Sequence, residues 1–305
     1  MDYKENPLSQ SLIKQFLYRG DERQPVCPYS IYAQYIAKTH KFQTESMQKG
    51  SLFETLCLGR GAGGRLTDDL PRKRLTKKQE IENIKRIANG QLPYKGDKTI
   101  DHIRIEQQAE KFTELADKYQ IMVSSGNTQV RITVPWHKDP NVYLSMEFDI
   151  FPTTIMTTEG LKFAVIDLKL TMDINSNFGE YCWGSPEFMD ITQAIMYLYG
   201  IKHVVKHIDL NPHMRELLTK PAVSLIDKNQ IFFYYWVFSY KRLENKLIKV
   251  NWDSNKEKEL HESINKTISL IEFYEQQGWE TKPNYNLCKS CPVKECIERQ
   301  EIEEI

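Results

Sequence analysis

Residues 141–171, NVYLSMEFDIFPTTIMTTEGLKFAVIDLKLT, decide the fold class of this chain. Together with residues 121–136 they form runs of β-branched and aromatic residues separated by turn signals. Such runs predict consecutive strands, antiparallel at first. Further strands are expected over 231–240 and 245–252. The middle of the chain therefore predicts a sheet.

Three polar residues in these strands are candidate catalytic or metal-binding residues. Asp149 interrupts the apolar run MEFDIF, and Asp167 and Lys169 lie two residues apart in the next strand. Side chains alternate along a strand, so Asp167 and Lys169 share one face while Leu168 packs into the opposite layer. Burying two unpaired carboxylates side by side is costly. A cation such as Mg²⁺, which prefers oxygen ligands, removes that cost. A salt-bridged strand with a surface lysine explains the short D-x-K pattern equally well.

Helical patterns lie on both sides of the predicted sheet. The apolar spacing of the remaining chain predicts helices over 9–19, 28–40, 44–59, 185–201 and 254–278. Residues 60–74 are rich in Gly, Arg and Pro and predict a loop, and residues 76–119 are charged and helical with a break near Gly96. The basic stretch 72–86 predicts a solvated surface, with DNA phosphates as the alternative contact.

The last helix has a clear apolar line and a clear end. The line consists of Leu260, Ile264, Ile268 and Ile271, and Gly278 is expected to end the helix. The helix over 185–201 has Ser185 and Pro186 at its start. Its Ile191, Ile195 and Leu198 are expected to pack on the sheet.

The bulk composition excludes several classes of protein. A chain of 305 residues with 40% hydrophobic residues can bury the core of one large α/β domain. The net charge of zero neither supports nor excludes a nucleic-acid partner. No run approaches the roughly 18 apolar residues of a membrane helix, and MDYKENPLSQ has no apolar signal core. A soluble, cytoplasmic protein is expected, with no membrane partner.

The order of the polar residues resembles the PD-(D/E)XK nuclease superfamily, in its RecB-like and phage-exonuclease branch. The matching residues, in order, are Glu54, Asp149, Asp167-x-Lys169 and Gln193-x-x-x-Tyr197. The resemblance implies an α/β fold with a restriction-endonuclease-like core, in which helices flank a mixed central sheet. Glu54 follows Gly50 by four residues, where many RecB-like relatives have His and lambda-type exonucleases tend to have Glu.

The resemblance also implies roles for these residues. Glu54, Asp149, Asp167 and the backbone carbonyl of Leu168 would hold one or two Mg²⁺ or Mn²⁺ ions, and Lys169 would position or activate the attacking water. Gln193 and Tyr197 lie four residues apart, so they share one helix face, with Asp190 near them. In the family this face contacts the DNA backbone. A polar helix edge is the alternative.

A group of cysteines lies near the end of the chain. Cys288, Cys291 and Cys296 are three ligands within nine residues, and a tetrahedral site needs a fourth. The resemblance to AddB and Cas-four-like nucleases implies that Cys27 is the fourth ligand of a [4Fe-4S] cluster joining the N- and C-terminal segments. Cys57 is the rival ligand and Zn²⁺ the rival metal, while Cys182 is expected to be structural or incidental.

These features predict a single nuclease domain over 1–305. Its parts are N-terminal helices (1–60), a charged helical insertion (61–119), a catalytic sheet and helix (120–250), and a C-terminal helix with the cysteine cluster (251–305). The resemblance implies a metal-dependent DNA exonuclease of prokaryotic or phage origin, acting in recombination, repair or phage replication. Alternatives are a Cas-four-like nuclease that trims DNA in CRISPR adaptation and a catalytically silent DNA-binding scaffold. A recombinase or single-strand-annealing protein and a second copy of the chain are the further expected partners.

Overall fold

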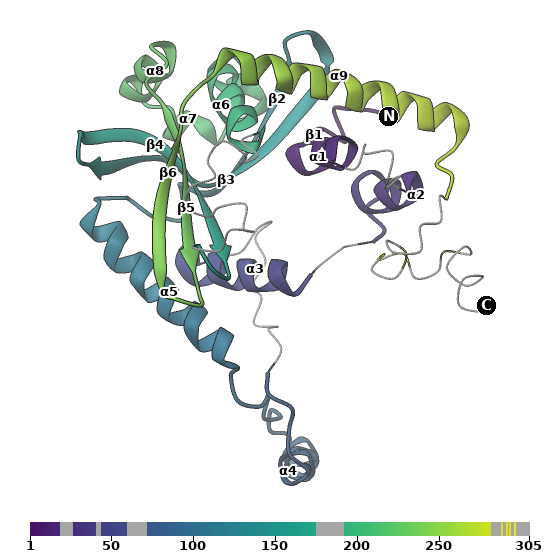
Figure 1. Ribbon diagram of the computed structural model, residues 1–305, viewed down its shortest axis with the longest axis vertical. Helices are drawn as coiled ribbons and strands as arrows, with labels where there is room; N and C mark the ends of the chain where they lie inside the picture. The colour runs from purple at the N-terminus through teal and green to yellow at the C-terminus, as the bar shows by residue number, and fades with distance from the viewer. Residues whose placement is uncertain are drawn as a thin grey trace.

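A six-stranded mixed sheet forms the centre of the protein, as Figure 1 shows for the computed structural model. The structure describes residues 1–18, 27–40, 44–59, 72–174 and 192–281, together with Cys288, Cys291, Val293 and Cys296. The strands are β1 (Leu8–Ser9), β2 (Thr128–Trp136), β3 (Asp139–Thr157), β4 (Gly160–Thr171), β5 (Phe232–Ser239) and β6 (Glu244–Val250). Their order is β1-β3-β4-β5-β6, and β2 pairs with β3.

The pairing directions make the sheet mixed. Strands β2, β3 and β4 form an antiparallel meander, β5 pairs parallel to β4, and β6 returns antiparallel to β5. The predicted α/β class, with a mixed central sheet flanked by helices, is confirmed. The short β1, which pairs parallel to β3, replaces the first residue of the predicted helix over 9–19.

Helices flank this sheet, and those that the sequence predicted appear in the predicted order, while the two short helices between residues 214 and 227 were not predicted. They are α1 (Gln10–Tyr18), α2 (Pro28–Ile31) with a π-helical turn (Tyr32–Ile36), α3 (Glu45–Leu58), α4 (Lys77–Ala88), α5 (Ile100–Lys118), α6 (Thr192–Val204) with a 3₁₀ turn (Val205–Leu210), α7 (Met214–Leu217), α8 (Lys220–Asp227) and α9 (Ser254–Gln277). Local chemistry sets the ends of α3: the Thr44 side chain accepts a hydrogen bond from the Met47 N–H, and Gly59 adopts a left-handed φ of 78°. Gly278, with a φ of 84°, ends α9 as predicted.

Two hydrophobic clusters lie on opposite faces of the sheet. One includes residues of α1, α6 and α9, and the other includes residues of α3 and α5. Strand β4 contributes to both, because Val165 joins the first cluster while Ile166 and Leu168 join the second. This alternation confirms that Leu168 packs into the opposite layer from its neighbours in sequence. The sheet thus separates two cores, and the polar residues of β4 lie between them.

The pairing of β3 and β4 ends beside the predicted acidic residues. The two strands pair from Thr157 and Gly160 to Ile150 and Ile166, with a bulge on β3 between Ile150 and Thr153. The next residues, Asp149 and Asp167, lie just beyond the last pair. A bulge bends its strand and re-aims side chains, which is common beside functional sites. The local geometry therefore brings the two aspartates next to each other where the strands part.

Helix α6 differs from the prediction. Ile195 and Leu198 are buried as expected, but the whole run from Ala194 to Ile201 is buried as well. The helix packs against β2, β3 and β5 on one side and lies next to α1 and α9. A helix enclosed by sheet and helices has no solvated face over this run. The predicted start at Ser185 and Pro186, and Asp190 and Ile191, lie outside the described residues.

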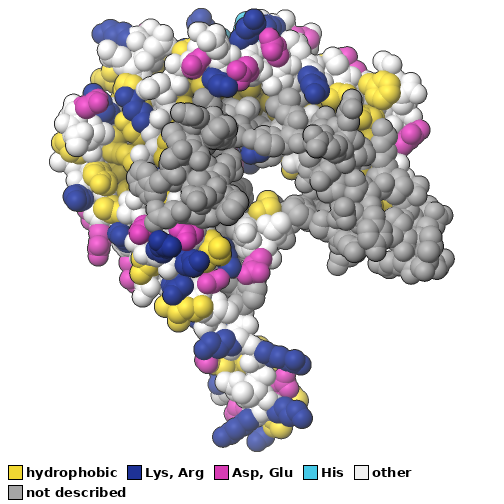
Figure 2. All heavy atoms as spheres, viewed as in Figure 1, with side chains coloured by type: hydrophobic (Ala, Val, Ile, Leu, Met, Phe, Trp, Pro, Cys, Tyr) yellow, Lys and Arg dark blue, Asp and Glu magenta, His cyan; other side chains and the backbone are white. Residues whose placement is uncertain are grey.

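Among the described residues of the predicted insertion 61–119, only the α4 part forms a projecting arm, because α5 packs into the second hydrophobic cluster. Helix α4 buries no residue, and Figure 2 shows its Lys and Arg side chains spread around the part that extends from the body. The turn after α4 is held by polar contacts: the Asn83 side chain pairs with the backbone N–H and carbonyl of Tyr94, and Arg86 donates to the Leu92 carbonyl. The break near Gly96 is confirmed, with a φ of 87° at that glycine. The solvated surface predicted for residues 72–86 agrees with this exposure.

Within the described ranges, no helix is both long enough and apolar enough to cross a membrane.

Candidate active site

Asp149 and Asp167 form a buried acidic pair where β3 and β4 part. Their exposed fractions are 7% and 3%. Asp149 is held from both neighbouring strands: its Oδ2 accepts a hydrogen bond from the Leu168 N–H at 2.6 Å, and its Oδ1 accepts one from Gln129 Nε2 at 3.1 Å. The Asp149 carboxylate therefore takes the place of a backbone acceptor for β4 at the point where the ladder ends.

Asp167 is held by a lysine and an amide. Lys169 Nζ lies 2.6 Å from Asp167 Oδ2, and Gln193 Nε2, on α6, donates to Asp167 Oδ1 at 2.8 Å. The shared face predicted for Asp167 and Lys169 agrees with this contact. The Lys169 side chain is 24% exposed, against 4% for the side chain of Asp167. Lys169 therefore links the buried carboxylate to solvent.

Burial and mutual repulsion disfavour the charged form of the pair. Burial raises the pKa of Asp149 well above its ordinary value, and the negative charges of Asp167 and Glu54 raise it further, against the opposing effects of Lys169 and the Leu168 N–H. Burial also raises the pKa of Asp167, and Lys169 and Gln193 oppose that rise. Two acids kept close at such a cost are typical of a site that binds a cation or transfers protons.

Helix α3 brings Glu54 and Cys57 toward this pair. Burial raises the pKa of the Cys57 thiol, and the charges of Glu54 and Asp149 add to the rise. Glu54 thus acts electrostatically on Asp149 from the opposite side of the site to α6. Among the described residues, however, no three His, Cys, Asp or Glu side chains are close enough to form a metal-ligand group. The three-carboxylate ligand set remains a prediction.

Tyr197 lies next to the acidic pair but is mostly a core residue. It is 8% exposed, and its ring packs edge-on against Phe148 at 4.8 Å and Phe233 at 5.8 Å between centroids. Burial, followed by the charge of Asp167, raises the pKa of its hydroxyl. Gln193, one turn earlier, contacts Asp167 directly. The predicted common face of the two residues therefore points at the acids, and their contact with DNA remains a prediction.

Gln129 is a site residue that the sequence did not reveal. Strand pairs Thr128–Ile150 and Val130–Phe148 place it directly opposite Asp149 on β2. It is one of the few non-glycine residues with a positive φ, 52°. Its position in the sequence, QVRITV, has no polar pattern that would mark it. Only the strand register, which the sequence does not state, identifies Gln129 as the partner of Asp149.

The cysteine-rich end lies against α2. Cys291 Sγ is 3.7 Å from Ser30 Oγ, and Ser30 lies one turn after Cys27, which precedes α2. The backbone N–H of Tyr29 donates to the Glu280 carbonyl at 3.3 Å. Residues 29–30 and residues 280–291 are therefore in contact. The described cysteines do not form a metal-ligand group, so the cluster remains a prediction, and Cys182 lies outside the described residues.

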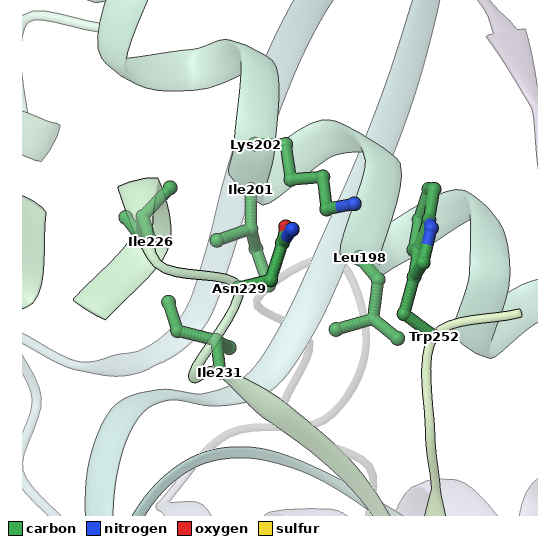
Figure 3. Close-up of a pocket in the computed structure, with 7 residues that line it drawn as sticks. All are labelled: Leu198, Ile201, Lys202, Ile226, Asn229, Ile231 and Trp252. Atoms are coloured by element: carbon green, nitrogen blue, oxygen red, sulfur yellow. The ribbon is translucent and has the colours of Figure 1, made fainter. Parts of the chain in front are cut away.

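A small cavity lies beside α6, and none of the residues that line it belongs to the acidic pair (Figure 3). It is lined by Leu198, Ile201, Lys202, Ile226, Asn229, Ile231 and Trp252. Lys202 Nζ lies 3.3 Å from the centre of the Trp252 ring. The cavity of about 10 Å³ has room for one water at most, so it is too small for a substrate.

Comparison with known proteins gives little further information. No protein-family model matches the chain, and no curated protein matches it. A crystal structure named "Putative exonuclease", from Eubacterium rectale, aligns over 98% of this chain and 88% of its own, with 13% identity and a TM-score of 0.44. The crystal structure named SSO0001 aligns over 97% and 87%, with 12% identity and a TM-score of 0.37. Likenesses of this size carry no weight for activity.

Proposed function

We propose that this protein is a metal-dependent DNA nuclease, an exonuclease that hydrolyses phosphodiester bonds at DNA ends. The observation that supports it is the buried pair Asp149 and Asp167 with Lys169 in contact with one of the two carboxylates. Carboxylates of this kind beside a lysine suit hydrolysis of a phosphodiester, which needs charge stabilisation and an oriented water.

The acidic pair fits a hard divalent cation. Asp149, Asp167 and the Leu168 carbonyl offer the oxygen ligands that Mg²⁺ or Mn²⁺ prefers, and Glu54 on α3 is the further carboxylate that acts on Asp149. When bound, such an ion lowers the pKa of a coordinated water and neutralises charge on the phosphate. The raised pKa values of both aspartates fit this function, because a cation offsets the repulsion that burial strengthens.

In this proposal Gln193 positions Asp167, and Lys169 stabilises charge or transfers a proton. Gln193 donates a hydrogen bond to Asp167 Oδ1, and Lys169 pairs with the other carboxylate oxygen, Oδ2. The partial exposure of Lys169 lets its ammonium group reach an incoming phosphate or exchange a proton with solvent. Lysines beside such sites contribute by charge stabilisation and proton transfer, typically 10²–10⁴-fold.

A digestion assay tests the proposal. Linear DNA labelled at its 5′ or 3′ end and circular DNA are incubated with the purified chain and Mg²⁺ or Mn²⁺. The proposal expects metal-dependent loss of linear DNA, suppressed by EDTA, with circular DNA intact. Cutting of circular DNA would instead indicate an endonuclease. Intact linear and single-stranded DNA with both metals would contradict the nuclease and favour a DNA-binding scaffold.

A matched pair of lysine variants on β4 locates the activity. Lys169→Gln is expected to lower the cleavage rate by about 10²-fold or more, since the group beside Asp167 is lost. Lys162→Gln, on the same strand, removes only a lysine paired with Glu159 at 3.4 Å and should cleave like the wild type. Equal rates for all three proteins would show that the site lies elsewhere.

We further propose that Cys27, Cys288, Cys291 and Cys296 bind a [4Fe-4S] cluster, with Zn²⁺ as the alternative. The contact between Cys291 and Ser30 supports Cys27 as the fourth ligand. Cys57 is less suitable, because it lies under the influence of Glu54 and Asp149 at the acidic site. Such a cluster would stabilise the fold by joining segments far apart in sequence.

Metal content and two serine variants test this assignment. Anaerobically purified protein is expected to be brown and to contain iron and sulfide, and Cys27→Ser should lose both. Cys57→Ser is the control and should keep them. A colourless protein that contains one equivalent of zinc would contradict the iron–sulfur cluster and identify the metal as zinc. Loss of metal in Cys57→Ser, with metal retained in Cys27→Ser, would identify Cys57 as the fourth ligand.

A further inference from the structure

Gln129 has a backbone conformation that its place in a strand does not explain. Its φ of 52° lies in the left-handed region, which non-glycine residues rarely adopt. The other described non-glycine residues with positive φ are Lys38, Gln120, Asn229 and Leu243, and all lie in turns or after helices. Gln129 alone among them lies within a strand, β2. Strained backbone inside regular structure is commonly retained at functional sites.

The side chain of Gln129 uses this conformation to reach Asp149. Its Nε2 donates to Asp149 Oδ1 at 3.1 Å, while the Leu168 N–H occupies Oδ2. The carboxylate is therefore held from β2 on one side and β4 on the other. The amide must face it with nitrogen, since the opposite orientation would bring two acceptors together.

The second polar atom of the same amide is also buried. Gln129 Oε1 is enclosed and has no hydrogen-bond partner among the described residues. Buried polar atoms are normally satisfied, and one that is not calls for an explanation. Because the two atoms belong to one amide, Oε1 lies in the neighbourhood of the acidic pair. A carbonyl oxygen there is an acceptor for the N–H or O–H of a group bound in the site.

From these observations we propose that Gln129 is a positioning residue of the acidic site. It orients Asp149 toward a divalent cation and supplies Oε1 as an acceptor for a water that accompanies the cation. This inference rests on the proposed function. It predicts that Gln129 contributes to metal binding without itself being needed for DNA binding. Residues that orient metal ligands typically affect metal affinity or activity by 10–100-fold.

The test measures Mn²⁺ binding by titration calorimetry on the full chain, without DNA, and then DNA cleavage. Gln129→Leu removes the amide, and Gln129→Gly removes it while fitting the left-handed backbone. Both are expected to weaken Mn²⁺ binding and to lower kcat at least tenfold, with the KM for DNA unchanged. Gln120→Gly is the matched control, because Gln120 is a glutamine with a φ of 56° that follows α5, away from the site.

The outcomes separate this inference from the proposed function. Wild-type levels of Mn²⁺ binding and cleavage in both Gln129 variants would overturn the role of Gln129 and leave the nuclease intact. A wild-type protein that neither binds Mn²⁺ nor cleaves DNA would overturn both. Unfolding of both variants, seen as loss of the cooperative thermal transition, would make Gln129 structural and also overturn the inference.

Discussion

At the level of single residues, the acidic pair Asp149 and Asp167 lowers the stability of the folded protein. Asp149 is buried with a raised pKa beside Asp167, and its neighbours satisfy both carboxylate oxygens without removing the repulsion. Functional sites commonly keep such destabilising groups, so that replacing them stabilises the protein while removing activity. The same two aspartates thus destabilise the fold locally and are the residues on which the proposed activity depends.

The variant Asp149→Asn tests whether the acidic pair lowers stability while it supports activity. Asparagine keeps an oxygen for the Leu168 N–H but has no charge to repel Asp167. In EDTA we expect unfolding free energy to rise by about 1 kcal/mol, which is roughly 2–4 °C in Tm for a large domain. Mn²⁺ should raise the Tm of the wild type and leave that of the variant unchanged.

Glu147→Gln is the control for this measurement. Glu147 lies two residues earlier on β3 and forms a surface ion pair with Arg131 at 2.5 Å. Its loss should change stability by less than about 0.5 kcal/mol and preserve the response to Mn²⁺. A clear loss of stability in Asp149→Asn would mean that the carboxylate holds β3 and β4 together more than it repels Asp167.

At the scale of elements, α6 decides how closely one layer of helices approaches the sheet. Gly200 faces β2 and β3, and a Cβ built there would lie 2.2 Å from Met146 Sδ and 3.2 Å from Ile132 Cδ1. Both of those residues are buried in the core. The close approach also brings Gln193, at the other end of the helix, to Asp167.

Two glycine-to-alanine variants in different helices should shift stability in opposite directions. Gly200→Ala is expected to cost about 1–3 kcal/mol, because the core must move to accept the methyl group. Gly50→Ala, in α3, is expected to stabilise by about 0.5–1 kcal/mol, because nothing lies within 4 Å of a Cβ there and alanine favours the helix. Urea unfolding measures both, and a neutral Gly200→Ala would mean that Met146 has room to adjust.

At the scale of the whole molecule, α9 joins the sheet to the ends of the chain. The N-terminal ammonium group pairs with Glu275 at 2.6 Å, and the Trp279 ring packs on Tyr32 with centroids 5.4 Å apart. Near its other end, α9 contributes His261, whose Nδ1 accepts a hydrogen bond from Trp136 Nε1 of β2 at 3.0 Å. His261 therefore lies where the last helix meets the sheet.

This histidine makes global stability depend on pH. Burial, together with the charges of His137, Lys138 and His203, lowers the pKa of His261 from 6.5 to about 4, and Glu257 lies 3.7 Å from its Nε2. The unfolded chain takes up a proton at higher pH than the folded one. The contribution of His261 is therefore fully present above pH 6.5 and is lost as pH falls toward 4.

Between pH 7.5 and pH 5 this loss should amount to about 2 kcal/mol at most. Urea unfolding at the two pH values measures it. In His261→Gln the side chain can still accept from Trp136 but does not titrate, so the pH dependence of unfolding should shrink by a corresponding amount. An unchanged pH dependence in His261→Gln would assign the effect to other groups, of which His203, with a pKa also lowered to about 4, is the nearest candidate.

The sequence predicted strands β2 to β6, the helices other than α7 and α8, and the face shared by Asp167 and Lys169. It could do so because alternation, helical spacing and the glycines at positions 59, 96 and 278 are local signals. Metal ligation and DNA cleavage remain predictions from the same residues.

The contacts between segments far apart in the chain came from the tertiary fold. It placed Gln129 opposite Asp149, replaced a backbone bond of β4 by the Asp149 carboxylate, and enclosed α6 so that Tyr197 became a core residue. Strand register, the end of a ladder and burial on all sides of a helix depend on contacts between segments far apart in the chain. Local patterns do not encode these contacts, which is why Gln129 and the Leu168 N–H, the partners of Asp149, were visible only in the fold.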